Sequence, residues 1–191
     1  MDRLSYAITS LAPQEVNEQF FDVKAHFDSF YLKNKPSKPD YYILKNLAHL
    51  TLKRRFYLRE GIRHEEVRSA LASVQFEPIP IQAQTLELFQ TQKFGNILVV
   101  LVDNTPELQK LHDDLSALIA TCSEPSTEEA YPFKPHLSVL YEVPEERLED
   151  AKRYIMEHIF PISYTLDSFQ FMTDVGVKGE RGIIKDYFAN K

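Results

Sequence analysis

Two short segments of the chain repeat one arrangement of side chains. One segment reads His49-Leu50-Thr51-Leu52, and the other reads His136-Leu137-Ser138-Val139. Residues two positions apart on a β-strand point to the same face of the sheet. If each segment is a strand, its histidine and its hydroxyl project together, while the apolar residues turn into a core.

The four polar residues of these segments offer the groups that cleave a phosphodiester. Two imidazoles facing each other across a cleft can act as general base and general acid near neutral pH. Hydroxyls beside them can donate hydrogen bonds to the non-bridging phosphate oxygens, where negative charge builds up during the reaction. The pattern therefore predicts His49 and His136 as catalytic residues and Thr51 and Ser138 as phosphate-binding residues.

This prediction depends on the repetition. The chain has six histidines, and only these two are followed by a hydroxyl two positions later in an apolar run. One such histidine alone is more often a half-buried strand residue without chemistry. Two non-catalytic alternatives stay open at this stage. One is a domain that binds a nucleotide or an RNA end without turnover, and the other is a structural or partner-binding domain with both histidines in its core.

The composition limits the partners of the chain. Its 191 residues, 43% hydrophobic and 26% charged, are expected to form one domain, residues 1–191. The net charge of −6 disfavours a protein that coats nucleic acid, so no DNA partner is expected. It allows a small nucleotide or an RNA end in a locally basic cleft. The sequence contains no metal-binding motif and no glycine-rich phosphate loop, so neither a metal nor a cofactor is expected.

Cysteine content and hydropathy bear on the compartment. The chain has one cysteine, Cys122, which excludes an internal disulfide framework and fits a reducing compartment. No signal-peptide pattern follows Met1, and no apolar run is long enough to cross a bilayer. We therefore expect a cytoplasmic protein that is not bound to a membrane, with a monomer as the expected oligomeric state.

Hydrophobic spacing predicts an α+β chain in which strands and helices alternate. Each histidine segment is followed by a helix, a long extended segment, a glycine-bearing turn and another strand. This order indicates an internal duplication. We expect two intertwined lobes related by a pseudo-twofold axis, with two antiparallel sheets and outer helices around a central cleft that carries both motifs. The predicted strands are 4–9, 41–44, 49–58, 78–89, 97–102, 136–141, 162–172 and 183–188, and the predicted helices are 13–30, 65–74, 105–118 and 144–155.

With its two H-x-[ST]-φ segments, where φ is apolar, the chain resembles the 2H phosphoesterases. This superfamily contains 2′,3′-cyclic nucleotide phosphodiesterases and 2′-5′ RNA ligase-like proteins. The stretch from Asn46 to Lys53 is similar to the first family motif, including the basic residue four positions after the histidine. The stretch from Pro135 to Tyr141 is similar to the second motif in its cyclic phosphodiesterase form. The resemblance spans essentially the whole chain, but only the two motifs are specific.

The resemblance implies an activity as well as a bilobal fold. It implies metal-independent hydrolysis of a 2′,3′-cyclic phosphate, on a nucleotide or an RNA end, to a 2′-phosphate. Many bacterial ligase-like members have an arginine near the position of Tyr141, so this chain departs from them there. A 2′-5′ phosphodiesterase or ligase activity is the alternative within the family. The sequence does not distinguish which histidine is the base and which is the acid.

Three further residues are candidates for substrate binding. Lys53 is four positions after His49 and is expected on the same strand face. Lys134 precedes the second motif. Tyr141 follows it, although simple alternation puts Tyr141 on the opposite face from His136. Two aromatic residues, Phe94 and Phe133, are candidates for stacking on a nucleobase, and the basic segment 32–40 is either a cleft rim or a solvated linker.

Overall fold

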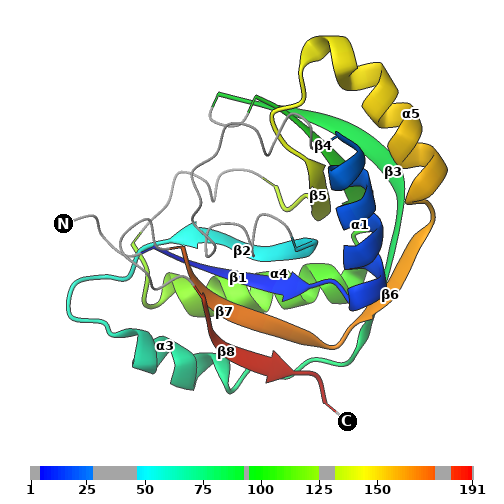
Figure 1. The fold of residues 1–191 in the computed structure, drawn as a ribbon. Helices are drawn as coiled ribbons and strands as arrows, with labels where there is room; N and C mark the ends of the chain where they lie inside the picture. The colour runs from blue at the N-terminus through cyan, green and yellow to red at the C-terminus, as the bar shows by residue number, and fades with distance from the viewer. Residues whose placement is uncertain (1–4, 28–46, 93–94, 125–131, 175–181, 191) are drawn as a thin grey trace.

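The computed structural model describes residues 5–27, 47–92, 95–124, 132–174 and 182–190. Within these ranges the chain forms eight strands, four α-helices and one 3-10 turn (Figure 1). No helix in the described ranges is long and apolar enough to span a membrane. The strands are β1 (Ser5–Leu11), β2 (His49–Phe56), β3 (Ile79–Thr91), β4 (Gly95–Val102), β5 (His136–Leu140), β6 (Ile162–Leu166), β7 (Ser168–Asp174) and β8 (Gly182–Phe188), and the helices are α1 (Gln14–Phe27), α3 (His64–Leu71), α4 (Pro106–Ala120) and α5 (Leu148–His158).

All eight strands belong to one antiparallel sheet, in the order β6-β3-β4-β5-β2-β1-β7-β8. The two motif strands, β2 and β5, lie side by side at its centre, where Leu50 pairs with Leu137. The prediction of two separate antiparallel sheets is therefore wrong, although the α+β class is confirmed. The sheet is curled in Figure 1, as expected from the right-handed twist of strands.

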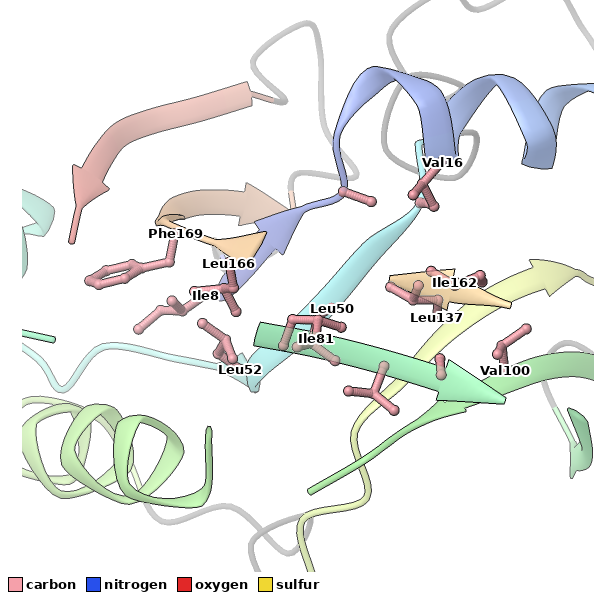
Figure 2. Close-up of a cluster of buried hydrophobic side chains, with 14 of the residues drawn as sticks. Ile8, Val16, Leu50, Leu52, Ile81, Val100, Leu137, Ile162, Leu166 and Phe169 are labelled. Carbon is pink, nitrogen blue, oxygen red and sulfur yellow. The ribbon is translucent and has the colours of Figure 1, made fainter. Parts of the chain in front are cut away.

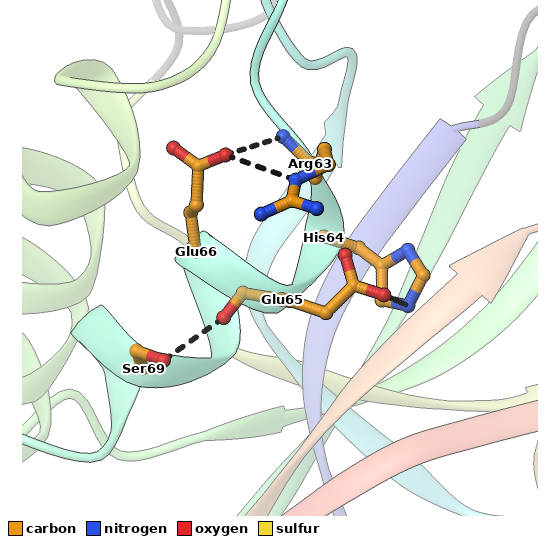
Figure 3. A network of polar contacts seen from close by, with 5 residues as sticks. All are labelled: Arg63, His64, Glu65, Glu66 and Ser69. Atoms are coloured by element: carbon orange, nitrogen blue, oxygen red, sulfur yellow. Dashed lines mark hydrogen bonds and ion pairs between the residues drawn. The ribbon is translucent and has the colours of Figure 1, made fainter.

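The helices support the motif strands crosswise. Helix α1 connects β1 to β2 but packs against β5 and α5, whereas α4 connects β4 to β5 but packs against β2 and α3. Thr105 caps α4, as its sequence predicts, because its Oγ1 accepts a hydrogen bond from the Leu108 N–H at 3.3 Å. At the start of α3, Glu66 accepts a hydrogen bond from the backbone N–H of Arg63 at 3.3 Å (Figure 3).

One predicted strand is divided in the structure. Residues 162–172 read as a single extended segment, but the chain forms β6 and β7 on either side of Asp167. β6 is the edge strand beside β3, whereas β7 pairs with β1 in the opposite half of the sheet. The chain therefore crosses between the two halves of the sheet at Asp167. A continuous apolar pattern cannot reveal such a crossing, because both strands bury residues on the core face.

The apolar residues of both motifs form the centre of the core. Leu50, Leu52, Leu137 and Val139 have 0% of their surface exposed. They pack with residues of neighbouring strands such as Ile8 and Phe169 in the cluster shown in Figure 2. Full burial of a leucine or valine side chain stabilises the fold by about 1.5–3 kcal/mol. The strands that carry the histidines are therefore anchored in the hydrophobic core.

Candidate active site

The polar residues of the two motifs share one face of the sheet. In β2 and in β5 the burial alternates in the same way, with His49, Thr51, His136 and Ser138 half-buried and the residues between them buried. Because both strands belong to one sheet, all four side chains lie on the face opposite the hydrophobic core. The structure thus brings together the four residues that the sequence singles out.

The register of β2 and β5 arranges these residues as a square. In an antiparallel pair, the neighbours of a matched pair also lie opposite each other. The pairing of Leu50 with Leu137 therefore puts Thr51 beside His136 and His49 beside Ser138. The two imidazoles occupy one diagonal of the square, and the two hydroxyls occupy the other.

Both histidine rings are held by the same kind of hydrogen bond. The Nδ1 atom of His49 lies 2.9 Å from the carbonyl oxygen of Leu47, and the Nδ1 atom of His136 lies 2.8 Å from that of Lys134. In a neutral ring Nδ1 must carry the hydrogen that it donates to the carbonyl, so Nε2 carries the lone pair. Each Nε2 can therefore accept a proton and, once protonated, donate it.

The surroundings of His49 favour its neutral form. Burial is the main cause that lowers its pKa below the usual value, and the positive charges of Lys24 and of protonated His136 lower it further. The hydrogen bond to the Leu47 carbonyl acts in the opposite direction. Such a ring is unprotonated at neutral pH and can act as a general base. The effect of His136 also places the two imidazoles within electrostatic reach of each other.

The pKa of His136 is also lowered, again mainly by burial. Arg54 and Lys134 lower it further, whereas the Lys134 carbonyl and the Glu87 carboxylate raise it. The edge of its ring meets Phe89, with 4.9 Å between the ring centroids. His136 therefore has a carboxylate among its neighbours, whereas no carboxylate in the described ranges is among the causes that act on the pKa of His49.

Lys134 forms an ion pair with Glu87 across the strands, with 2.6 Å between Nζ and a carboxylate oxygen. Its Nζ also lies 5.2 Å from the centroid of the Phe89 ring. The side chain of Lys134 thus pairs with Glu87 of β3, while its backbone carbonyl lies within hydrogen-bond distance of the His136 ring. These contacts support a role for Lys134 in positioning His136.

Lys53 does not share the face of His49 and Thr51, so this prediction is wrong. The register of β2 against β1 shifts between Thr9, which pairs with Thr51, and Ile8, which pairs with Lys53. The extra residue is a β-bulge, which interrupts the alternation of faces. Lys53 is consequently 7% exposed and lies opposite a core residue.

The same interruption occurs in β5. Its register against β4 shifts between Ser138, which pairs with Val99, and Leu140, which pairs with Leu98. Val139 and Leu140 are both buried, so the simple alternation that puts Tyr141 opposite His136 does not continue past Ser138. Tyr141 is half-buried and follows the end of β5.

Phe133 is stacked on His112 of α4, with 3.9 Å between the ring centroids and 8° between the planes. The Nδ1 atom of His112 lies 2.6 Å from the carbonyl oxygen of Leu52. One face of Phe133 is therefore covered, and the stack joins α4 to β2 and to the segment before β5. Phe94, the basic segment 32–40 and the predicted strand 41–44 lie outside the described residues.

The sequence analysis missed a residue that supports His49 from α1. The carboxamide of Asn17 donates to the Ala12 carbonyl at 2.7 Å and accepts from the Ala48 N–H at 2.6 Å. Asn17 is buried and fixes the backbone immediately before His49. A polar residue beside the buried positions Val16 and Phe20 of an amphipathic helix was the available signal.

Solved structures with the same fold are known. The chain is similar to LigT of E. coli complexed with 3′-AMP, at 16% identity, a TM-score of 0.65 and coverage of 100% of both chains. It is also similar to TT0787 of Thermus thermophilus, at 16% identity, a TM-score of 0.61 and coverage of 96% of this chain and 97% of that one. The protein thus has the α+β fold of LigT.

The family of the chain follows from a match to a family model. A family model of the 2′-5′ RNA ligase superfamily matches residues 13–178, which include both motifs. The chain therefore belongs to the 2′-5′ RNA ligase superfamily, that is, to the 2H phosphoesterases. A comparison with curated proteins gives no significant match. Among the described residues, no group of three or more His, Cys, Asp or Glu side chains is arranged to hold a metal ion.

Proposed function

We propose that the protein hydrolyses a 2′,3′-cyclic phosphate, on a nucleotide or an RNA end, to a 2′-phosphate without a metal ion. The observation that carries this proposal is the square formed by His49, Thr51, His136 and Ser138. It combines two proton-transfer groups of the same tautomer with two hydroxyl donors on a rigid sheet. These are the groups that in-line displacement at phosphorus requires.

The reaction follows from these groups. The reacting phosphate lies between the two histidines, and Thr51 and Ser138 donate hydrogen bonds to its non-bridging oxygens. The Nε2 atom of one histidine takes a proton from water as the water oxygen attacks phosphorus. The bond from phosphorus to the ribose O3′ breaks, and the Nε2–H of the other histidine protonates O3′. Because both rings make the same Nδ1 hydrogen bond, either histidine can be the base and the other the acid.

The order of the strands supports an internal duplication. Each motif strand follows a strand and a helix, as β1-α1-β2 and β4-α4-β5, and each is followed by a second helix. In the sheet, β4 lies beside the motif strand β5, and β1 lies in the equivalent place beside the motif strand β2. We infer two intertwined lobes within one domain, residues 1–191, with the active site on the pseudo-twofold axis between them.

A nucleotide substrate is supported by the solved relatives, since E. coli LigT has been determined in complex with 3′-AMP, with ATP and with NADP+. The free thiol of Cys122 agrees with a cytoplasmic location, which we also infer. Cyclic phosphate as the substrate class is favoured over a ligase substrate because Tyr141 stands where many ligase-like members have an arginine.

The proposal is tested by hydrolysis of a nucleoside 2′,3′-cyclic monophosphate in the presence of EDTA. Replacing His49 or His136 by alanine is expected to lower kcat by about 10²–10⁴-fold, the usual contribution of a general acid or base. Thr51→Val and Ser138→Ala are expected to cost about 10²-fold, the lower range for one donor to the developing charge. Retained turnover in either histidine variant contradicts the mechanism, and nucleotide binding without turnover by the unmodified protein indicates a binding domain.

A further inference from the structure

Both motif strands contain a bulge at the same place relative to the histidine. The first five residues of β2 and of β5 have the same burial pattern, in which the fourth and fifth residues are both buried. Lys53 and Leu140 hold the fifth position and lie opposite the core residues Ile8 and Leu98. In β2, which continues past the bulge, the sixth residue therefore turns back to the face of the site. This residue is Arg54.

Arg54 is an exposed residue of β2. Within the described parts of the chain, no hydrogen bond, ion pair or ring contact engages its guanidinium. The other two cations near His136 are different, since Lys134 is paired with Glu87 and Lys53 is buried. Among these three residues, Arg54 has the charge that is available to a ligand.

The position of Arg54 lies toward one end of the site. β2 rises by roughly 3.3 Å per residue, so Arg54 is about 10 Å along the strand from Thr51, on the side away from His49. Thr51 lies opposite His136, so Arg54 is nearer to His136 than to His49. Its charge lowers the pKa of His136 and of His112 but is not among the causes that act on His49.

We propose that Arg54 binds a second anionic group of the substrate, a phosphate next to the reacting one in a nucleotide chain. This inference rests on the proposed function, because it takes the reacting phosphate to lie among His49, Thr51, His136 and Ser138. A guanidinium binds phosphate through two parallel hydrogen bonds. In an RNA end that carries a cyclic phosphate, the neighbouring phosphate is attached to O5′ of the same nucleoside. The site thus selects the end of an oligonucleotide over a free nucleoside cyclic phosphate.

The test compares two ligands that differ only in that phosphate, adenosine 2′-monophosphate and adenosine 2′,5′-bisphosphate. Calorimetry gives Kd for each with the unmodified protein, with Arg54→Gln and with Arg153→Gln. Arg153 is exposed on α5, away from the motif strands, so its variant matches the change in charge. The unmodified protein and Arg153→Gln are expected to prefer the bisphosphate. Arg54→Gln is expected to lose this preference by about tenfold or more, the usual value of a charged hydrogen bond, and to keep its affinity for the monophosphate.

Two results overturn the inference. In one, Arg54→Gln keeps the preference for the bisphosphate. In the other, it weakens both ligands equally, which places Arg54 on the reacting phosphate. An unchanged melting temperature confirms that the variant is folded, and Arg54→Lys provides a second variant that retains the charge. Because these are binding measurements, absence of turnover of a cyclic phosphate would contradict the proposed function alone.

Discussion

Each histidine of the site makes the same kind of hydrogen bond, to the carbonyl two residues before it, but the charges around the two rings differ. His49 is supported by the buried, uncharged amide of Asn17 through the backbone of Ala48. His136 is supported by an exposed ion pair, because the residue whose carbonyl it contacts, Lys134, is bound to Glu87. The sequence predicts the two rings as equivalent, and only the cross-strand contacts reveal the difference.

Replacing Glu87 by glutamine is expected to lower the pKa of His136. The carboxylate raises this pKa, whereas Lys134 and Arg54 lower it, so removal of the carboxylate leaves the lowering charges unopposed. Lys134→Met is expected to raise the same pKa. The measurement is an NMR titration of the imidazole signals in the free protein. The signal of His49 is the internal control and is expected to shift less, because, among the described residues, Glu87 and Lys134 act on its pKa only through His136. Equal shifts of both histidines would contradict this assignment of charges.

At the scale of the elements, strand alternation predicts the faces of the motifs but not where alternation stops. His49, Thr51, His136 and Ser138 lie on one face as expected, whereas the bulge in β2 puts Lys53 on the core face. A bulge depends on the pairing with β1 and β4, and neither partner is specified within the motif itself. The candidate site is thus predictable for the four motif residues, and its surroundings are not.

Helix α1 holds β2 through one buried side chain, so Asn17→Ala is expected to destabilise the protein. The variant leaves the Ala12 carbonyl and the Ala48 N–H without their side-chain partner, at a cost of about 1–3 kcal/mol for a buried polar group. Urea unfolding measures the loss. Gln14→Ala, at an exposed position of the same helix, is the control and is expected to change the free energy of unfolding by less than about 0.5 kcal/mol. Equal stability of the two variants would show that the Asn17 contacts contribute nothing.

At the scale of the whole molecule, the sequence predicts most strands and helices but not how the strands pair. The apolar patterns of β2, β4, β5 and α4 identify these elements because burial on one face fixes their periodicity. The single sheet arises from one pairing, Leu50 with Leu137, and the crossing from β6 to β7 arises from partners distant in sequence. Which distant strands pair depends on how all possible pairings compare in stability. Local hydrophobic periodicity carries no information on that comparison.

The stability of the whole molecule is expected to fall between pH 7.5 and pH 5.5. Burial lowers the pKa of His49, His112 and His136 below the ordinary value of 6.5. The unfolded chain therefore takes up protons at a higher pH than the folded protein does. The stabilisation is fully present above pH 6.5 and is lost as the pH falls toward the folded-state pKa values.

Urea unfolding at the two pH values measures this loss. His112→Gln is expected to reduce the difference in free energy of unfolding between them, because it removes one of the three groups. His64→Gln, at a position of α3 whose side chain is 43% exposed, serves as the control variant. A free energy of unfolding that stays constant or increases toward pH 5.5 would contradict the burial of these rings in their neutral form.

The central claim is that paired histidines hydrolyse a cyclic phosphate without a metal ion. The most direct test is ³¹P NMR of a nucleoside 2′,3′-cyclic monophosphate incubated in EDTA with the unmodified protein and, separately, with His136→Ala. The account predicts conversion to the 2′-monophosphate by the unmodified protein and a rate at least about 100-fold lower with the variant. Conversion at equal rates by both proteins, or none by the unmodified protein, would contradict it.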